Sequence, residues 1–186
     1  MSTQRLLVYF VRITYYIALV ALLSNLILQQ TRFYYYRPFF VPFSIRLNHQ
    51  SVVLPVGDTV KLSVFGINKR VSYSSTDFKV AYVLFNGKVF AIRVGKAVIN
   101  ANVDGEKVQC LITVVDINRE KLSLKLKETY KLKIEGTNST VSWSSTDTSV
   151  VKVDERGNVI AVGTGSATVT GKVEGAKLSC RIKVSK

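Results

Sequence analysis

Five lysines gather between residues 121 and 133, where they could attract an anion. Leu122 and Leu124 alternate with their neighbours, so period-two alternation places the leucines inward and the lysines in solvent. A patch of ammonium groups attracts anionic material such as wall polymers, lipid headgroups or another subunit. Lysines also discourage edge-to-edge strand pairing, so a purely structural role stays open. The predicted anion-contact residues are Lys121, Lys125, Lys127, Lys131 and Lys133.

The remaining reactive side chains do not form a catalytic set. Cys110 and Cys180 alternate with apolar residues and are expected to be buried thiols. His49 is the single histidine and has no neighbouring ligand for a metal. We therefore expect no enzyme activity, no catalytic residues, no cofactor and no metal site.

Acidic side chains are expected to organise turns. Asp77 and Asp147 each follow Ser-Ser-Thr, and a carboxylate at such a place bonds nearby backbone amides. Asp154 with Glu155 could offer several oxygens to calcium, and this alternative stays open.

The chain is strongly basic, with a formal net charge of +14 over 186 residues. This charge divides into +5 for residues 1–46, +3 for 47–116 and +6 for 117–186. Nucleic acid is not expected as a partner, because the lysine patch lacks interleaved exposed aromatic residues and the chain has the layout of an exported protein.

An internal repeat organises most of the chain. Residues 47–116 align without a gap on residues 117–186, with 26 identical positions out of 70, and we call these the first and second repeats. The segment VSYSSTD at 71–77 recurs as VSWSSTD at 141–147. A repeat of this length predicts two small domains, each with its own core.

Short alternating segments predict β-strands in both repeats. In the second repeat they lie at 131–134, 150–153, 167–170 and 178–184, separated by glycine-containing turns. Many short strands at this spacing favour a β-sandwich. Trp143, which aligns with Tyr73, is expected to face inward and fill the core.

A series of motifs runs through the second repeat: Trp143-Ser144-Ser145, the following Asp147, the Val151-Lys152-Val153 strand and the glycine turn into Val159-Ile160-Ala161. In these motifs the second repeat resembles the bacterial immunoglobulin-like domains of group 2. The first repeat departs from the pattern, since Tyr73 replaces the tryptophan and Val83-Leu84-Phe85-Asn86 replaces an acidic turn. The resemblance implies tandem immunoglobulin-like sandwiches of the kind found as stalks and adhesin modules on bacterial surfaces, without catalytic residues.

The N-terminal zone is predicted to meet a membrane. Residues 6–28 carry a single charge, Arg12, and a helix of that length, at about 1.5 Å per residue, spans a layer of about 30 Å. We predict a cytoplasmic tail at 1–5, a transmembrane helix at 6–28 and an aromatic interfacial stem at 29–46. Cleavage near residue 24 as a secretory signal is the alternative. The residues expected to contact the membrane interface or a partner are Arg12, Tyr34, Tyr35, Tyr36 and Arg37.

The predicted fold class is all-β, with two tandem immunoglobulin-like sandwiches at 47–116 and 117–186 behind one transmembrane helix. The expected function is that of an adhesion module or envelope spacer, anchored with its N-terminus inside and its domains outside. The alternative is an accessory subunit of a membrane complex or surface filament, assembled through the span and the stem.

Overall fold

The computed structural model describes residues 12–23, 45–65, 70–103 and 105–186. All of its strands lie in one compact unit, Ile45–Phe65 with Val71–Lys186. The strands of the first repeat, two of which extend one residue beyond its bounds, are β1 (Arg46–Leu47), β2 (Ser51–Pro55), β3 (Thr59–Lys61), β4 (Val64–Phe65), β5 (Ser72–Ser75), β6 (Ala81–Val83), β7 (Lys88–Ala91), β8 (Gly95–Val103) and β9 (Glu106–Ile117). The second repeat contributes β10 (Lys121–Lys125), β11 (Thr129–Lys131), β12 (Ile134–Glu135), β13 (Ser142–Ser145), β14 (Val151–Val153), β15 (Asn158–Ala161), β16 (Gly165–Val173) and β17 (Ala176–Ser185).

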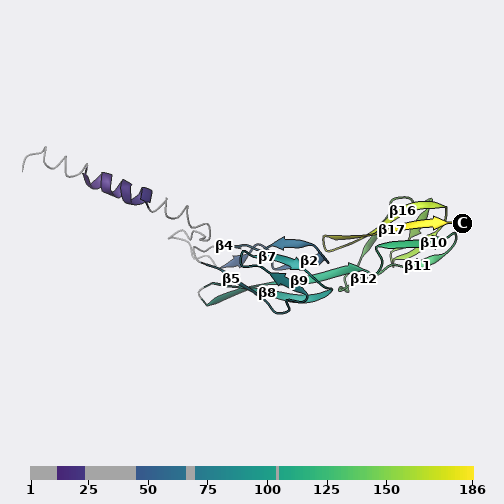
Figure 1. Ribbon diagram of the computed structural model, residues 1–186, viewed down its shortest axis with the longest axis horizontal. Coiled ribbons are helices and arrows are strands. Elements are labelled where there is room, and N and C mark those ends of the chain that lie inside the picture. Colours follow the sequence, from purple (N-terminus) through teal and green to yellow (C-terminus); the bar gives the residue numbers. More distant parts are fainter. Residues whose placement is uncertain (1–11, 24–44, 66–69, 104) are drawn as a thin grey trace, which may run out of the picture. The chain divides into compact units, whose positions relative to one another are not determined.

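The strand pairing confirms an all-β architecture for this unit (Figure 1). In the second repeat, one sheet has the order β10-β17-β16-β13 and the other β11-β15-β14. In the first repeat, β2, β9, β8 and β5 form the sheet that corresponds to the former, and β3-β7-β6 corresponds to the latter. Strand β9 runs on to Ile117, where β12 pairs with its end. The predicted division of the chain at residues 116 and 117 stays a prediction.

Pairing registers recur at the same spacing of 70 residues as the sequence identities. Ser51 pairs with Leu111 in the parallel β2–β9 ladder, and Lys121 pairs with Arg181 in the parallel β10–β17 ladder. The antiparallel pair Tyr73–Ala101 likewise recurs as Trp143–Gly171. The two repeats therefore share one set of pairings, even where the paired residues differ.

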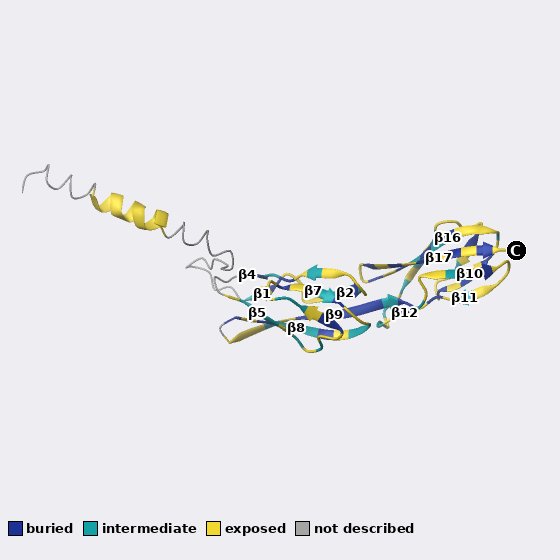
Figure 2. Ribbon diagram, viewed as in Figure 1, coloured by how far each residue is buried: buried dark blue, intermediate teal, exposed yellow. Residues whose placement is uncertain are grey.

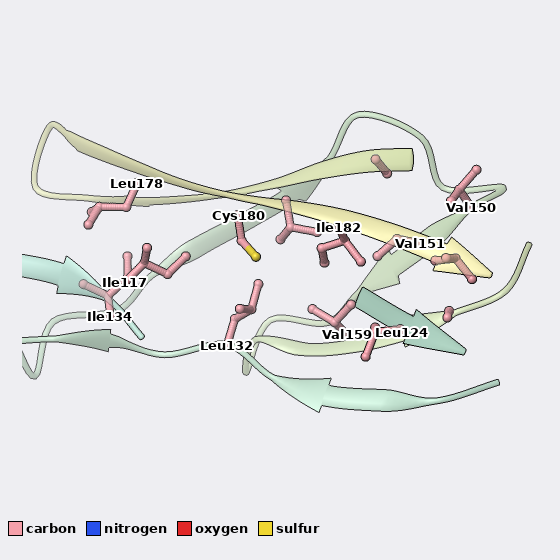
Figure 3. Close-up of a cluster of buried hydrophobic side chains, with 14 of the residues drawn as sticks. Ile117, Leu124, Leu132, Ile134, Val150, Val151, Val159, Leu178, Cys180 and Ile182 are labelled. Atoms are coloured by element: carbon pink, nitrogen blue, oxygen red, sulfur yellow. The ribbon is translucent and has the colours of Figure 1, made fainter. Parts of the chain in front are cut away.

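Strand alternation produces a buried apolar layer between the sheets. Along β17 every second residue is buried. On β16 every second residue from Ala167 onward is buried, and the residues between them are half-buried or exposed (Figure 2). Leu178, Cys180 and Ile182 project from β17 toward Leu132 and Val159 (Figure 3). Trp143 is partly buried and packs against this cluster, which confirms its predicted role in the core.

The structure differs from the sequence prediction at residues 131–134, which were expected to form one strand. Strand β11 ends at Lys131 and pairs with β15, whereas β12 begins at Ile134 and pairs with β9. Asn118 bridges the gap: its Nδ2 donates to the Lys131 carbonyl at 3.1 Å and its Oδ1 accepts from the Lys133 amide at 3.0 Å. The side chain thus replaces ladder bonds where the chain crosses between sheets.

In the N-terminal zone the structure describes one helix, at residues 12–23. This helix lies inside the predicted span 6–28, whose remaining residues are outside the described part of the chain. Among the described residues, no helix is both long enough and apolar enough to cross a membrane.

Candidate functional site: a basic sheet face

The outward face of the sheet β10-β17-β16-β13 is basic. Outward positions along β17 are exposed because they alternate with the buried core residues. Parallel pairing with β10 and antiparallel pairing with β16 place further cations beside them. We call this set the basic face, and it consists of Lys121, Lys125, Lys172, Lys177, Arg181 and Lys183.

Two register pairs within the basic face set like charges directly opposite each other. Lys121 pairs with Arg181, and Lys172 pairs with Lys177. Directly opposed residues on neighbouring strands have Cβ atoms about 4.5–5.5 Å apart, and like charges there destabilise the sheet. The two pairs therefore lower the stability of the sheet. A bound anion that neutralises both partners of a pair would relieve the repulsion.

Hydroxyl groups occupy most of the other outward positions. Thr168 pairs with Arg181, Ser123 pairs with Lys183, and the Thr170 and Ser179 hydroxyl oxygens lie 3.1 Å apart. None of the four described strands of this sheet contains an Asp or a Glu. Ammonium, guanidinium and hydroxyl donors without competing carboxylates are suited to phosphate or carboxylate groups repeated along a polymer.

Carboxylates lie at the margin of the basic face. Lys121, Lys177 and Arg181 line a groove whose lining also includes Asp116 and Glu120. The Glu120 backbone carbonyl accepts a hydrogen bond from the Arg181 amide at 2.8 Å. Three of the six cations of the basic face therefore have carboxylate residues in the same groove, whereas Lys125, Lys172 and Lys183 are not part of its lining.

The first repeat has the same sheet without the same charge. Positions 121, 125, 172, 181 and 183 of the basic face align with Ser51, Pro55, Asn102, Leu111 and Thr113. Lys107 aligns with Lys177 and is the one cation retained at the six positions, while Lys96 adds a cation where the second repeat has Ser166. The basic face is thus a property of the second repeat and not of the shared fold.

The five predicted lysines are all exposed, but the structure divides them between two sheets. Lys121 and Lys125 lie on β10 and belong to the basic face. Lys131 lies on β11 in the opposite sheet, Lys127 lies in the turn between the two strands, and Lys133 follows β11. Strands β10 and β11 do not pair with each other, so the five side chains do not form one surface.

The sequence prediction missed four members of the basic face: Lys172, Lys177, Arg181 and Lys183. Alternation along residues 178–184 already placed Arg181 and Lys183 outward. Their proximity to Lys121 depends on the parallel pairing of β10 with β17, which joins residues 60 positions apart. Alternation gives the direction of a side chain but not its cross-strand neighbour.

The other predicted contact residues lie in the N-terminal zone. Arg12 is exposed on the described helix. Tyr34, Tyr35, Tyr36 and Arg37 fall outside the described residues. Their predicted contacts with a membrane interface or partner stay predictions.

The acidic turns follow the sequence prediction. The Asp77 and Asp147 carboxylates accept hydrogen bonds from the backbone amides two residues on, each at 2.9 Å. The Ser149 hydroxyl donates to Asp147 at 2.6 Å, and this bond is the main reason that the pKa of Asp147 is lowered. Both carboxylates thus hold the turn that precedes the next strand.

Asp154 is also occupied by its own turn. The Asn158 side-chain amide donates to it at 2.6 Å and the Arg156 and Asn158 backbone amides at 2.9 and 2.8 Å. The Asn158 side-chain bond contributes most to the lowered pKa of Asp154. Within residues 12–23, 45–65, 70–103 and 105–186, no three His, Cys, Asp or Glu side chains are grouped as a metal site.

Among curated proteins, the chain is similar to parts of much longer ones. It is 36% identical over 136 residues to an uncharacterised protein of Clostridium acetobutylicum, and the match covers 63% of this chain and 14% of that protein. It is 43% identical over 49 residues to the polysaccharide lyase 8 family protein HylA of Enterococcus faecalis, covering 26% of this chain and 4% of that protein.

Solved structures include two similar bacterial proteins. A C-terminal fragment of intimin, in complex with the intimin-binding domain of the translocated intimin receptor, is 17% identical with a TM-score of 0.46, covering 76% of this chain and 63% of that one. Invasin, a bacterial integrin-binding protein, is 15% identical with a TM-score of 0.44, covering 76% and 38%.

A family model matches the part of the chain that carries most of the basic face. The match extends over residues 111–180, from within β9 to within β17, and includes the Trp143-Ser144-Ser145 motif. The all-β pairing described above agrees with an immunoglobulin-like fold. Residues 111–180 therefore match the family described as bacterial Ig-like domain (group 2).

Proposed function

We propose that this protein is a membrane-tethered, surface-exposed binding module whose basic face contacts an anionic polymer of the cell wall or cell surface. In this proposal the two repeats are tandem immunoglobulin-like domains outside the cell, and residues 6–28 anchor them. The protein acts by binding or spacing and not as an enzyme. The observation that carries the proposal is the set of six cations on one sheet face without a carboxylate in its four strands.

Repeated charge suits a polymer better than a small anion. The cations follow the length of β17 from Lys177 to Lys183 instead of converging on a point. Strand residues rise about 3.3 Å each, so outward side chains recur at about 6.6 Å along the strand. A chain of phosphates or carboxylates can meet several of them at once, and counterion release then makes the affinity depend on salt.

Binding of the full chain to an immobilised glycerol-phosphate teichoic acid tests this proposal. The face variant carries Lys177→Gln, Arg181→Gln and Lys183→Gln, and the control variant carries Lys127→Gln, Lys131→Gln and Lys133→Gln. Three contacts of about 0.5 kcal/mol each predict binding about tenfold weaker for the face variant. The control removes the same charge from other surfaces and should change affinity less than about twofold.

Two results would contradict the proposed contact. Equal weakening by both variants would show that net charge matters and the face does not. Affinity that does not fall as salt concentration rises would exclude an electrostatic contact altogether.

The subunit alternative predicts a different outcome. A polar residue in an apolar span pairs with partner helices, and Arg12 is exposed on the described helix. A stoichiometric partner that accompanies the full chain in mild detergent, and is lost with Arg12→Leu, would support assembly into a complex. Retention of that partner by the face variant would show that it does not bind through the basic face.

A further inference from the structure

The first repeat exposes an apolar, largely aromatic surface on its smaller sheet. Phe78 and Tyr82 are 65% and 47% exposed, and Ile92 is 52% exposed. Phe90 pairs directly with Tyr82 across strands β7 and β6. These side chains line one open groove together with Leu84, and we call the set Phe78, Tyr82, Leu84, Phe90 and Ile92 the aromatic face.

Cations border the aromatic face. Lys79 and Arg93 line the same groove, and the Lys88 ammonium lies 5.0 Å from the centroid of the Phe90 ring. The described lining contains neither Asp nor Glu. The surface therefore combines large apolar side chains with a positive rim.

The second repeat does not share this surface. Its residues Thr148, Lys152, Asp154 and Ile160 align with Phe78, Tyr82, Leu84 and Phe90. The cross-strand pair Tyr82–Phe90 is replaced by Lys152–Ile160 in the same register. Because the second repeat forms the same pairing without an aromatic residue here, the aromatic face is not a requirement of the sandwich.

We propose that the aromatic face lies on an anionic lipid surface, with its rings at the headgroup and acyl boundary and Lys79, Lys88 and Arg93 beside lipid phosphates. Phe, Leu and Ile suit the acyl boundary, the tyrosine suits the wet headgroup layer, and bordering cations attract anionic headgroups. The polar side-chain groups of this lining are the Tyr82 hydroxyl and the two cations, so it offers no carboxylate or amide to the hydroxyl groups of a sugar polymer.

The position of the first repeat in the chain supports the same occupant. It begins at residue 47, shortly after the predicted span at 6–28, so this part of the inference rests on the proposed membrane tether. The repeat that would stand next to the bilayer is the one with the apolar surface. The repeat farther along the chain carries the basic, hydroxyl-rich face instead.

Tryptophan probes at matched positions test this contact. Phe78→Trp places a probe on the aromatic face, and Thr148→Trp places one at the aligned position of the second repeat. The full chain is reconstituted into phosphatidylcholine vesicles that contain phosphatidylglycerol, with bromine on the acyl chains near the headgroup. Trp143 is common to both variants, and its emission is measured in the unsubstituted chain.

An apolar surface at the acyl boundary inserts about 5–10 Å, so the probe at 78 should lose roughly half of its emission to bromine. The probe at 148 should keep its emission. Replacing Lys79, Lys88 and Arg93 with Gln, or omitting phosphatidylglycerol, should reduce the quenching at 78. Equal quenching at both positions, no quenching at 78, or quenching that ignores phosphatidylglycerol would each overturn the proposal.

Flotation of the same vesicles separates this inference from the tether. If the protein floats after a high-salt wash but its probe at 78 is unquenched, the tether is supported and the aromatic contact is contradicted. If the protein washes off in high salt but its probe at 78 is quenched in low salt, the aromatic contact is supported and the tether is contradicted. If the protein floats at neither salt concentration, both are contradicted.

Discussion

At the scale of single residues, the core compensates for a substitution between the repeats. Trp143 faces Gly171, and a Cβ at 171 would lie 2.8 Å from Cζ3 of Trp143 and 3.0 Å from Cδ1 of Ile134. The first repeat has the smaller Tyr73 facing the larger Ala101. Ring size and backbone substituent therefore vary together, as volume conservation in a packed core requires.

This compensation can be measured by exchanging the pair. Gly171→Ala alone should destabilise the protein by about 1–3 kcal/mol through overpacking. Trp143→Tyr alone should cost about 1–2 kcal/mol through the space that it leaves. The double variant should be more stable than the sum predicts by about 1 kcal/mol, because the methyl group fills that space. Urea unfolding followed by circular dichroism gives the three values, and strict additivity would contradict the pairing.

The two thiols are the other residue-scale feature that is open to test. Cys110 and Cys180 are buried and not disulfide-bonded, and burial raises the pKa of each to about 11. The folded state favours the neutral thiol. The contribution of each thiol to the free energy of unfolding is therefore complete below the unfolded pKa of about 8.5 and is lost as pH rises toward 11.

Neither thiol of the folded protein should therefore react with a disulfide reagent at pH 8, since the thiolate is the nucleophile and is scarce there. Both should react in denaturant, which serves as the control. Reaction of either thiol in the folded protein at the rate of free cysteine would contradict its burial.

At the scale of elements, the alternating pattern located strands but not the sheet to which each belongs. Residues Lys131 to Ile134 keep their alternation while the chain crosses from one sheet to the other, because Leu132 and Ile134 enter the same core from both sides of the crossing. The basic face was missed in part for a related reason. The partner of β10 is the last strand of the repeat, and the spacing of residues does not specify that pairing.

The crossing itself depends on an asparagine that occurs in both repeats. Asn48 bonds the Lys61 carbonyl and the Ser63 amide at 2.9 Å each, as Asn118 does for Lys131 and Lys133. Asn118→Ala should lower the free energy of unfolding by about 1–2 kcal/mol through loss of two bonds. Ser123→Ala, on the outward side of β10, should change it by less than about 0.5 kcal/mol. Equal stability of the two variants in urea would show that water replaces the asparagine.

At the scale of the whole molecule, the repeats share their core positions and differ in their surfaces. Val89, Ala91, Ala97 and Cys110 of the first repeat have identical counterparts in the second, and all four are buried. The second repeat has six cations where the first has one, and the first has an aromatic groove where the second has no aromatic side chain. Surface substitutions on a shared core thus distinguish the two repeats, and the two proposed contacts rest on that difference.

The parallel ladder between β10 and β17 also determines how the second repeat responds to tension. A pull on the chain before Lys121 and after Ser185 draws two neighbouring parallel strands in opposite directions. Their hydrogen bonds then lie across the pulling direction and share the load, instead of opening one after another as in an unzipped hairpin. Resistance to forced unfolding is governed by the rate of that first rupture. The ladder that assembles the basic face would therefore also resist a load applied through the two ends of the second repeat.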